Sequence, residues 1–174
     1  ILMAMKRGHT ALEYKATIRA LRRIRPNMSL SSDIIVGFPG ETEEDFEETV
    51  SLCREVRFQN AFIFKYSPRK DTPAAKMPDQ LPEKLIEERH AHLLSVVDEI
   101  RTPHYQDFVG QQVQILAEGP SRKNPATLEG RTRCNKIVIF EGAQRHIGQL
   151  LDVKITSASS TTLYGDPAVL NLDE

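Results

Sequence analysis

The chain has 174 residues, of which 40% are hydrophobic, enough for one domain or two small domains with packed cores. It contains no apolar run near the roughly 20 residues that span a bilayer, so we expect no membrane-spanning helix and a cytoplasmic location. Its two cysteines, Cys53 and Cys134, lie far apart, which argues against a disulfide framework or a metal knuckle.

Helix and strand patterns alternate in the first half of the chain. Thr10 and Glu13 form a capping-box pattern, and apolar residues follow at helical spacing as far as Pro26. Residues 31–38 predict a strand, residues 42–56 a helix with a second capping box, and residues 60–67 another strand. This order is typical of a parallel sheet or barrel.

The first predicted strand is apolar on both faces, apart from Asp33. We therefore expect both faces of the strand to be covered. We expect Asp33 to be buried and to brace an arginine or a backbone amide, and contact with a cofactor is the alternative. Six acidic residues between Glu41 and Glu48 predict a charged first helical turn that the helix dipole favours.

A loop and a long helix connect this half to a β-rich second half. Residues 67–80 predict the loop, and Leu81-Pro82 begins a helix that Pro103 interrupts. Beyond Gly110 the pattern predicts five short strands, which indicate a small antiparallel barrel or sandwich. These strands are residues 113–117, 127–131, 136–140, 150–156 and 161–164. We place the domains at residues 1–104 and 105–174.

Four motifs, in this order, resemble the radical S-adenosylmethionine (SAM) methylthiotransferases. They are VGFPGET at 36–42, FKYSPR with DTPAAKM at 64–77, EGPS at 118–121 and GRTRCNK at 130–136. The resemblance spans essentially the whole chain. It implies an α/β fold, with the C-terminal part of a radical SAM parallel (β/α) partial barrel followed by a TRAM domain, an RNA-binding, all-β antiparallel barrel like the OB fold.

The resemblance also implies an activity, a transferase that methylthiolates carbon 2 of N6-isopentenyladenosine next to the tRNA anticodon. Relatives that modify N6-threonylcarbamoyladenosine in tRNA, or an aspartate of a ribosomal protein, are alternatives. An RNA substrate is favoured because Pro68-Arg69 stands where the protein-modifying relatives usually carry an acid. A non-enzymatic RNA-binding module is a further alternative.

In such enzymes 4Fe–4S clusters are held by cysteines, three of them in a Cys-x3-Cys-x2-Cys loop that this sequence lacks. We therefore expect a fragment that is inactive alone, with no catalytic residue and no metal ligand of its own. The implied partners are the tRNA anticodon stem-loop and a reductant such as flavodoxin or ferredoxin, and we expect a monomer.

Two groups of site residues follow from the resemblance. The strand ends would hold the SAM adenine through Ile35, Val36, Gly37, Phe38, Tyr66, Ser67 and Pro68. RNA would bind to Ser121, Arg122, Lys123, Arg131, Thr132, Arg133, Asn135 and Lys136. Alternation along a strand over residues 130–136 would place Arg131, Arg133 and Asn135 on one face, with 121–124 as a neighbouring basic loop.

Overall fold

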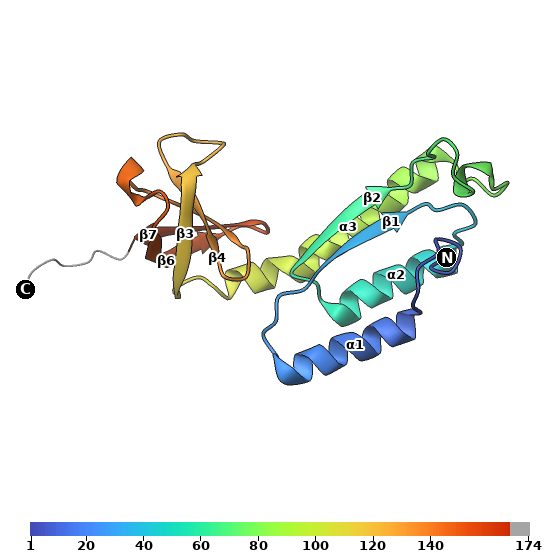
Figure 1. The fold of residues 1–174 in the computed structure, drawn as a ribbon, viewed down its shortest axis with the longest axis horizontal. Coiled ribbons are helices and arrows are strands. Elements are labelled where there is room, and N and C mark those ends of the chain that lie inside the picture. The colour runs from blue at the N-terminus through green and yellow to red at the C-terminus, as the bar shows by residue number, and fades with distance from the viewer. Residues whose placement is uncertain (168–174) are drawn as a thin grey trace, which may run out of the picture. The chain divides into compact units, whose positions relative to one another are not determined.

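A computed structural model describes residues 1–167, which form two compact units that divide between Ile100 and Arg101 (Figure 1). The first unit contains a two-stranded sheet and its helices. Its elements are α1 (Ala11–Ile24), β1 (Ser31–Val36), α2 (Glu43–Val56), β2 (Asn60–Lys65), the 3-10 turn η1 (Ala74–Lys76) and most of α3 (Glu83–Gln106). β1 and β2 are parallel and pair from Ser31 with Asn60 to Val36 with Lys65, so the predicted parallel α/β arrangement is confirmed.

Both predicted capping boxes form. Thr10 and Glu13 cap α1, and Thr42 and Asp45 cap α2. At α2 the Thr42 hydroxyl accepts the Asp45 amide at 3.2 Å, and the Thr42 amide donates to the Asp45 carboxylate at 2.9 Å. The amide and hydroxyl of Thr42 lower the pKa of Asp45. The sequence thus defines the helix starts through local hydrogen bonds.

One face of the sheet carries the core of the first unit. Val36, Ala61 and Ile63 pack there in one buried cluster with residues from α1, α2 and α3. The opposite face is open, since Phe62 and Phe64 are 52% and 50% exposed. The prediction that both faces of β1 are covered is therefore wrong for this chain.

Asp33 lies on the open face, opposite Phe62 in the parallel register, and is exposed. The expectation of a buried, bracing Asp33 is also wrong, because solvent can hydrate its carboxylate.

Helix α3 continues through Pro103, where the sequence predicted an interruption. The Asp107 amide donates to the Pro103 carbonyl at 2.9 Å, so helical hydrogen bonding resumes after the proline. Tyr105 explains why the helix persists. It is 7% exposed and belongs to the core of the second unit, and this packing opposes the cost of a proline inside a helix.

The second unit is a closed barrel with the strand order β3-β4-β5-β7-β6. Its elements are β3 (Gln112–Pro120), β4 (Leu128–Thr132), β5 (Ile137–Phe140), the 3-10 turn η2 (Gln144–His146), β6 (Leu150–Ala158) and β7 (Thr162–Pro167). The predicted small barrel is confirmed, but not as a purely antiparallel one. β5 and β7 pair in parallel, because β6, which lies between them in sequence, runs in the opposite direction.

Inward-facing residues of all five strands fill the barrel, among them Ile115, Val138, Val153 and Leu163, each at most 1% exposed. Within residues 1–167, none of the helices combines the length and the apolar character needed to cross a bilayer.

The two cysteines should differ sharply in reactivity. Cys53 is fully buried on α2, and burial raises the pKa of its thiol to about 11, whereas Cys134 is half-buried in a turn. At pH 8 we expect Cys53 to be alkylated at least on the order of 100-fold more slowly than an ordinary thiol, because so little thiolate is present. Alkylation followed by peptide mass spectrometry measures both sites. Equal labelling of Cys53 and Cys134 without denaturant would contradict the packing of α2.

Candidate functional sites at the strand corner and the barrel turn

A tight corner follows the carboxyl end of β1. Gly37 has a φ of +79°, and a Cβ atom there would lie 2.6 Å from Cγ1 of Ile86 on α3, so no larger residue fits. In the next turn the Glu41 amide donates to the Phe38 carbonyl at 2.9 Å, and Gly40 has a φ of +83°. Pro39 before this glycine gives the features of a type II turn.

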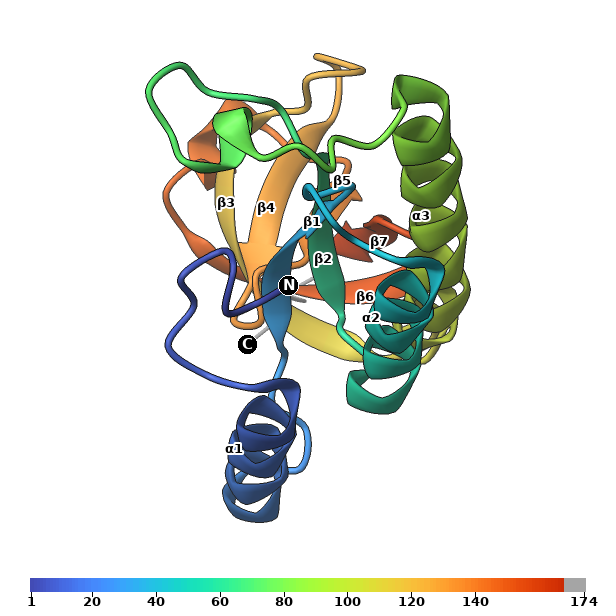
Figure 2. The ribbon, with the colours of Figure 1, turned by 90° about the vertical axis from the view of Figure 1, so that its right-hand side faces the viewer.

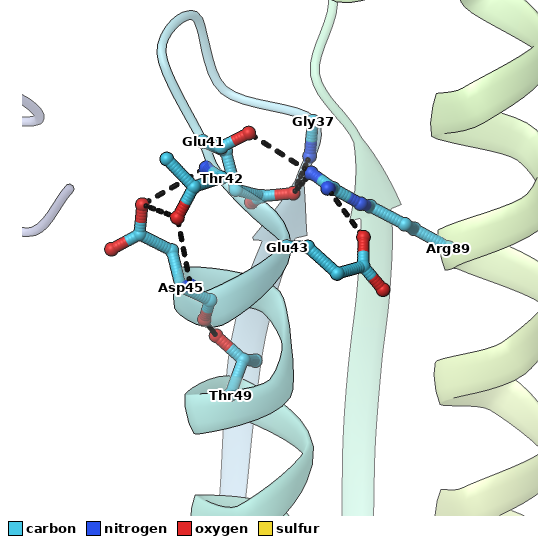
Figure 3. A network of polar contacts seen from close by, with 7 residues as sticks. All are labelled: Gly37, Glu41, Thr42, Glu43, Asp45, Thr49 and Arg89. Atoms are coloured by element: carbon cyan, nitrogen blue, oxygen red, sulfur yellow. Dashed lines mark hydrogen bonds and ion pairs between the residues drawn. The ribbon is translucent and has the colours of Figure 1, made fainter.

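A buried ion pair anchors this corner to α3 (Figure 3). Nη1 of Arg89 lies 2.8 Å from Oε1 of Glu41 and also donates to the Glu41 carbonyl at 3.1 Å. Both side chains are only 5% exposed. Glu41 therefore lies in the corner before α2 and not in the charged first turn of the helix, so that prediction is wrong for this residue.

Arg89 has further partners around its guanidinium. Nη2 donates to Glu43 at 2.8 Å, and the group lies over the ring of Phe46, 5.3 Å from its centroid. Burial alone would lower the pKa of Arg89, but the hydrogen bonds to Glu43 and Glu41 outweigh burial and raise it. Arg89 is thus a permanent, neutralised charge inside the unit.

Sequence reasoning missed Arg89, although a signal was present. The residue falls three positions after Ile86 and four before Leu93, both of which are buried. A charged residue on the apolar stripe of a helix needs a buried partner.

The exit of β2 lies beside the corner. The Tyr66 amide donates to the Val36 carbonyl at 2.8 Å, and the Tyr66 ring meets Phe38 edge-on with centroids 5.4 Å apart. The Tyr66 hydroxyl is buried, with no hydrogen-bond partner among the described residues. The structure therefore brings together three of the residues predicted for SAM, Gly37, Phe38 and Tyr66.

The other predicted SAM residues occupy different environments. The Val36 side chain is 1% exposed inside the core, Ile35 is half-buried on the side of the open sheet face, and Ser67 and Pro68 are exposed. The loop after β2, green in Figure 2, returns to the corner, where Gly40 donates to the Asp79 carbonyl at 2.9 Å.

On the barrel, the predicted strand over residues 130–136 is wrong in its second half. β4 ends at Thr132, and the chain then turns, with Asn135 at a φ of +63°. The Asn135 amide donates to the Thr132 carbonyl at 2.9 Å, and the Thr132 hydroxyl accepts the Lys136 amide at 3.0 Å. Asparagine tolerates positive φ, so Asn135 was the signal for this turn.

The turn still brings two of the predicted RNA residues together. Arg131 donates to Asn135 at 3.0 Å and to Glu118 at 3.1 Å, and Arg133 next to them is exposed. Lys136 instead is 4% exposed, and its ammonium lies 5.2 Å and 5.3 Å from the ring centroids of Tyr105 and Phe108.

The second basic loop lies at the opposite end of β4. β4 joins the 121–127 loop at Leu128 and the 133–136 turn at Thr132, so about 13 Å of strand separates them. Arg122 and Lys123 are exposed there, while Ser121 and Thr132 are buried. The sequence predicted this loop to be a close neighbour of Arg133, and that prediction is wrong. The loop is instead a second cationic segment, at the other end of β4.

Comparisons with known proteins match both units. Residues 1–53 match the Radical SAM superfamily and residues 106–168 match the TRAM domain. The chain belongs to the radical SAM superfamily and carries a TRAM domain.

Similar proteins are named tRNA-2-methylthio-N(6)-dimethylallyladenosine synthase. Those of Acidovorax sp. (strain JS42) and Delftia acidovorans (strain DSM 14801 / SPH-1) are 51% and 50% identical over 95% and 97% of the chain. The protein of Methylacidiphilum infernorum (isolate V4) is 47% identical over the whole chain. The chain spans 37–38% of the length of these relatives.

The radical SAM segment fits SAM at the corner but does not fit an iron–sulfur cluster. A buried, unpartnered Tyr66 hydroxyl beside the Phe38 ring suits an aromatic base that offers hydrogen-bond acceptors. Cys53 and Cys134 belong to different units, and within residues 1–167 no group of three metal-ligating side chains is close enough to bind a metal ion. Cluster chemistry therefore has no ligands among these residues.

Proposed function

We propose that this chain is the part of a tRNA methylthiotransferase that closes the SAM pocket and holds the tRNA. The substrate we propose is N6-isopentenyladenosine next to the anticodon, modified at carbon 2. The observation that carries the proposal is the 47–51% identity, over both units, with relatives named for this reaction. SAM supplies the radical and the methyl group when bound, and cysteines outside these 174 residues would hold the clusters.

On the RNA side, we propose that cations along β4 contact phosphates. Arg122 and Lys123 at one end and Arg133 at the other are exposed, and Arg131 lies between them with its guanidinium oriented by Glu118 and Asn135. Spaced cations on a strand and on the loops at its two ends suit successive phosphates of a folded RNA. Buried Ser121, Thr132 and Lys136 would shape these segments rather than contact RNA.

On the cofactor side, we propose that the SAM adenine lies against the corner. Gly37 and Phe38 would contribute backbone and ring, and Tyr66 its hydroxyl. Ile35, Ser67 and Pro68 would line the approach, and Val36 would contribute its backbone only, because its side chain is in the core. We place the functional boundary between these two roles at residues 104 and 105.

The test is binding of an anticodon stem-loop, with and without the isopentenyl group, to the full-length protein across a salt series. We expect tight, salt-sensitive binding, and a slope of log affinity against log salt that falls by about one for Arg133→Ala and by about two for Arg122→Ala/Lys123→Ala. Lys136→Met should leave the slope unchanged, because its ammonium already faces two aromatic rings.

Arg54→Ala on α2 is the matched control, since it removes an exposed cation from the other unit. Loss of affinity in Arg54→Ala equal to that in Arg133→Ala would overturn the assignment of RNA binding to β4. RNA binding without SAM binding would favour an RNA-binding module. Preference for a threonylcarbamoyl-modified stem-loop, or methylthiolation of a ribosomal protein only, would favour the other two relatives.

We also propose a cytoplasmic, monomeric enzyme that receives electrons from a flavodoxin or ferredoxin. The support is chemical, because reductive cleavage of SAM needs a low-potential donor and tRNA is a cytoplasmic substrate.

A further inference from the structure

Arg89 is a buried charged side chain whose interactions link two elements at the corner. It is 5% exposed and comes from the second turn of α3, while its partners are Glu41, in the corner after β1, and Glu43, the first residue of α2 (Figure 3). Three hydrogen bonds are made by its two terminal nitrogens. Its Nε is buried with no partner among the described residues.

The guanidinium is linked to the backbone at the end of β1 through the carboxylate of Glu41. The same oxygen of Glu41 that accepts from Arg89 at 2.8 Å also accepts the amide of Gly37 at 3.0 Å. Arg89 therefore fixes the orientation of the peptide group that enters the corner, through a single carboxylate. Charge-assisted hydrogen bonds of this kind are short and directional.

Other contacts already define the helix that follows. The capping box of Thr42 and Asp45 starts α2, and the Phe38–Glu41 hydrogen bond closes the turn. These do not restrain the Gly37 amide, which the structure bonds to Glu41. Glu43, 69% exposed, adds a solvated partner that contributes little.

We propose that Arg89 is a positioning residue for SAM, acting through Glu41 on the Gly37 peptide. This rests on the proposed cofactor site at the corner. Arg89 touches no cofactor itself, and its role is to hold the Gly37–Phe38 backbone in the one geometry in which the base can lie against it. Preorganisation of this kind lowers the free energy that binding must spend on ordering the site.

The experiment compares Arg89→Lys and Glu41→Gln in the full-length protein, with Glu43→Gln as the matched control. Lysine keeps the charge but loses the fork that reaches two carboxylates. We expect Arg89→Lys to raise the Kd and the KM for SAM about tenfold, the factor that corresponds to one charge-assisted hydrogen bond. The Kd and KM for tRNA should stay within about twofold, and Glu43→Gln should resemble wild type.

Comparing the change in KM for SAM with the change in KM for tRNA distinguishes a positioning role from an effect on stability. A variant that is only less stable loses active protein for both substrates and leaves both KM values unchanged. SAM constants within twofold of wild type for Arg89→Lys and Glu41→Gln would overturn the proposal. Absence of SAM binding in the wild-type protein would overturn the proposed cofactor site itself, and the role of Arg89 with it.

Discussion

Replacement of Gly165 by alanine should reduce the free energy of unfolding of the TRAM barrel by about 3 kcal/mol. Gly165 lies on β7 between Phe140 of β5 and Ile155 of β6. A Cβ atom there would lie 2.7 Å from Cγ1 of Val153 and closer still to the carbonyl oxygen of Lys154. Since one of these is backbone in a closed barrel, the methyl group can be accommodated only by moving β6 from β7.

Amide hydrogen exchange of residues 111–167 is the suitable measurement, because it reports on the barrel separately from the first unit. Gly119→Ala on β3 is the control. A Cβ atom at Gly119 would meet no heavy atom within 4 Å, and we expect a change within about 0.5 kcal/mol. Equal protection in the two variants would show that β6 and β7 do not approach each other this closely.

Features determined by neighbouring residues could be predicted from the sequence. The starts of α1 and α2 follow from a threonine and an acid three positions later, and both capping boxes form. The corner after β1 also follows, because Pro39 and Gly40 suit its turn. In each case the hydrogen-bonding partners lie within four residues of one another.

Features determined by distant packing could not be predicted. Pro103 signals an interruption, but the burial of Tyr105 in the barrel keeps α3 intact. The open face at Phe62 and Phe64 was unpredictable for a different reason. An apolar strand pattern shows which side chains avoid water, and not whether the covering element belongs to the same 174 residues.

The candidate site was predicted only in part, because some of its residues follow from local patterns and others are paired by distant packing. Gly37, Phe38 and Tyr66 follow two strands whose carboxyl ends meet in a parallel sheet, and the structure does bring them together. Arg89 lies 48 residues from Glu41 in sequence. Nothing in the local pattern pairs these two residues, although the charge on an apolar helix face shows that some partner must exist.

Replacement of Arg89 by methionine should lower the free energy of unfolding of the first unit by about 3–5 kcal/mol, the usual cost of removing one member of a buried ion pair. Methionine has a similar volume and keeps contact with Phe46, but it leaves the carboxylate of Glu41 buried without its cation. Amide hydrogen exchange of α2 and α3 measures the loss. This expected instability is why the cofactor experiment uses lysine.

The double variant Glu41→Gln/Arg89→Met distinguishes a lost charge partner from lost packing. Glutamine is neutral and can still accept the Gly37 amide, so the double variant should be more stable than Arg89→Met by about 2 kcal/mol. Arg54→Met is the exposed counterpart, because Arg54 lies 4.0 Å from Glu99 with both side chains more than half exposed, and we expect a change below about 1 kcal/mol. A double variant no more stable than Arg89→Met would mean that the packing of the arginine stem, and not its pairing with Glu41, stabilises the corner.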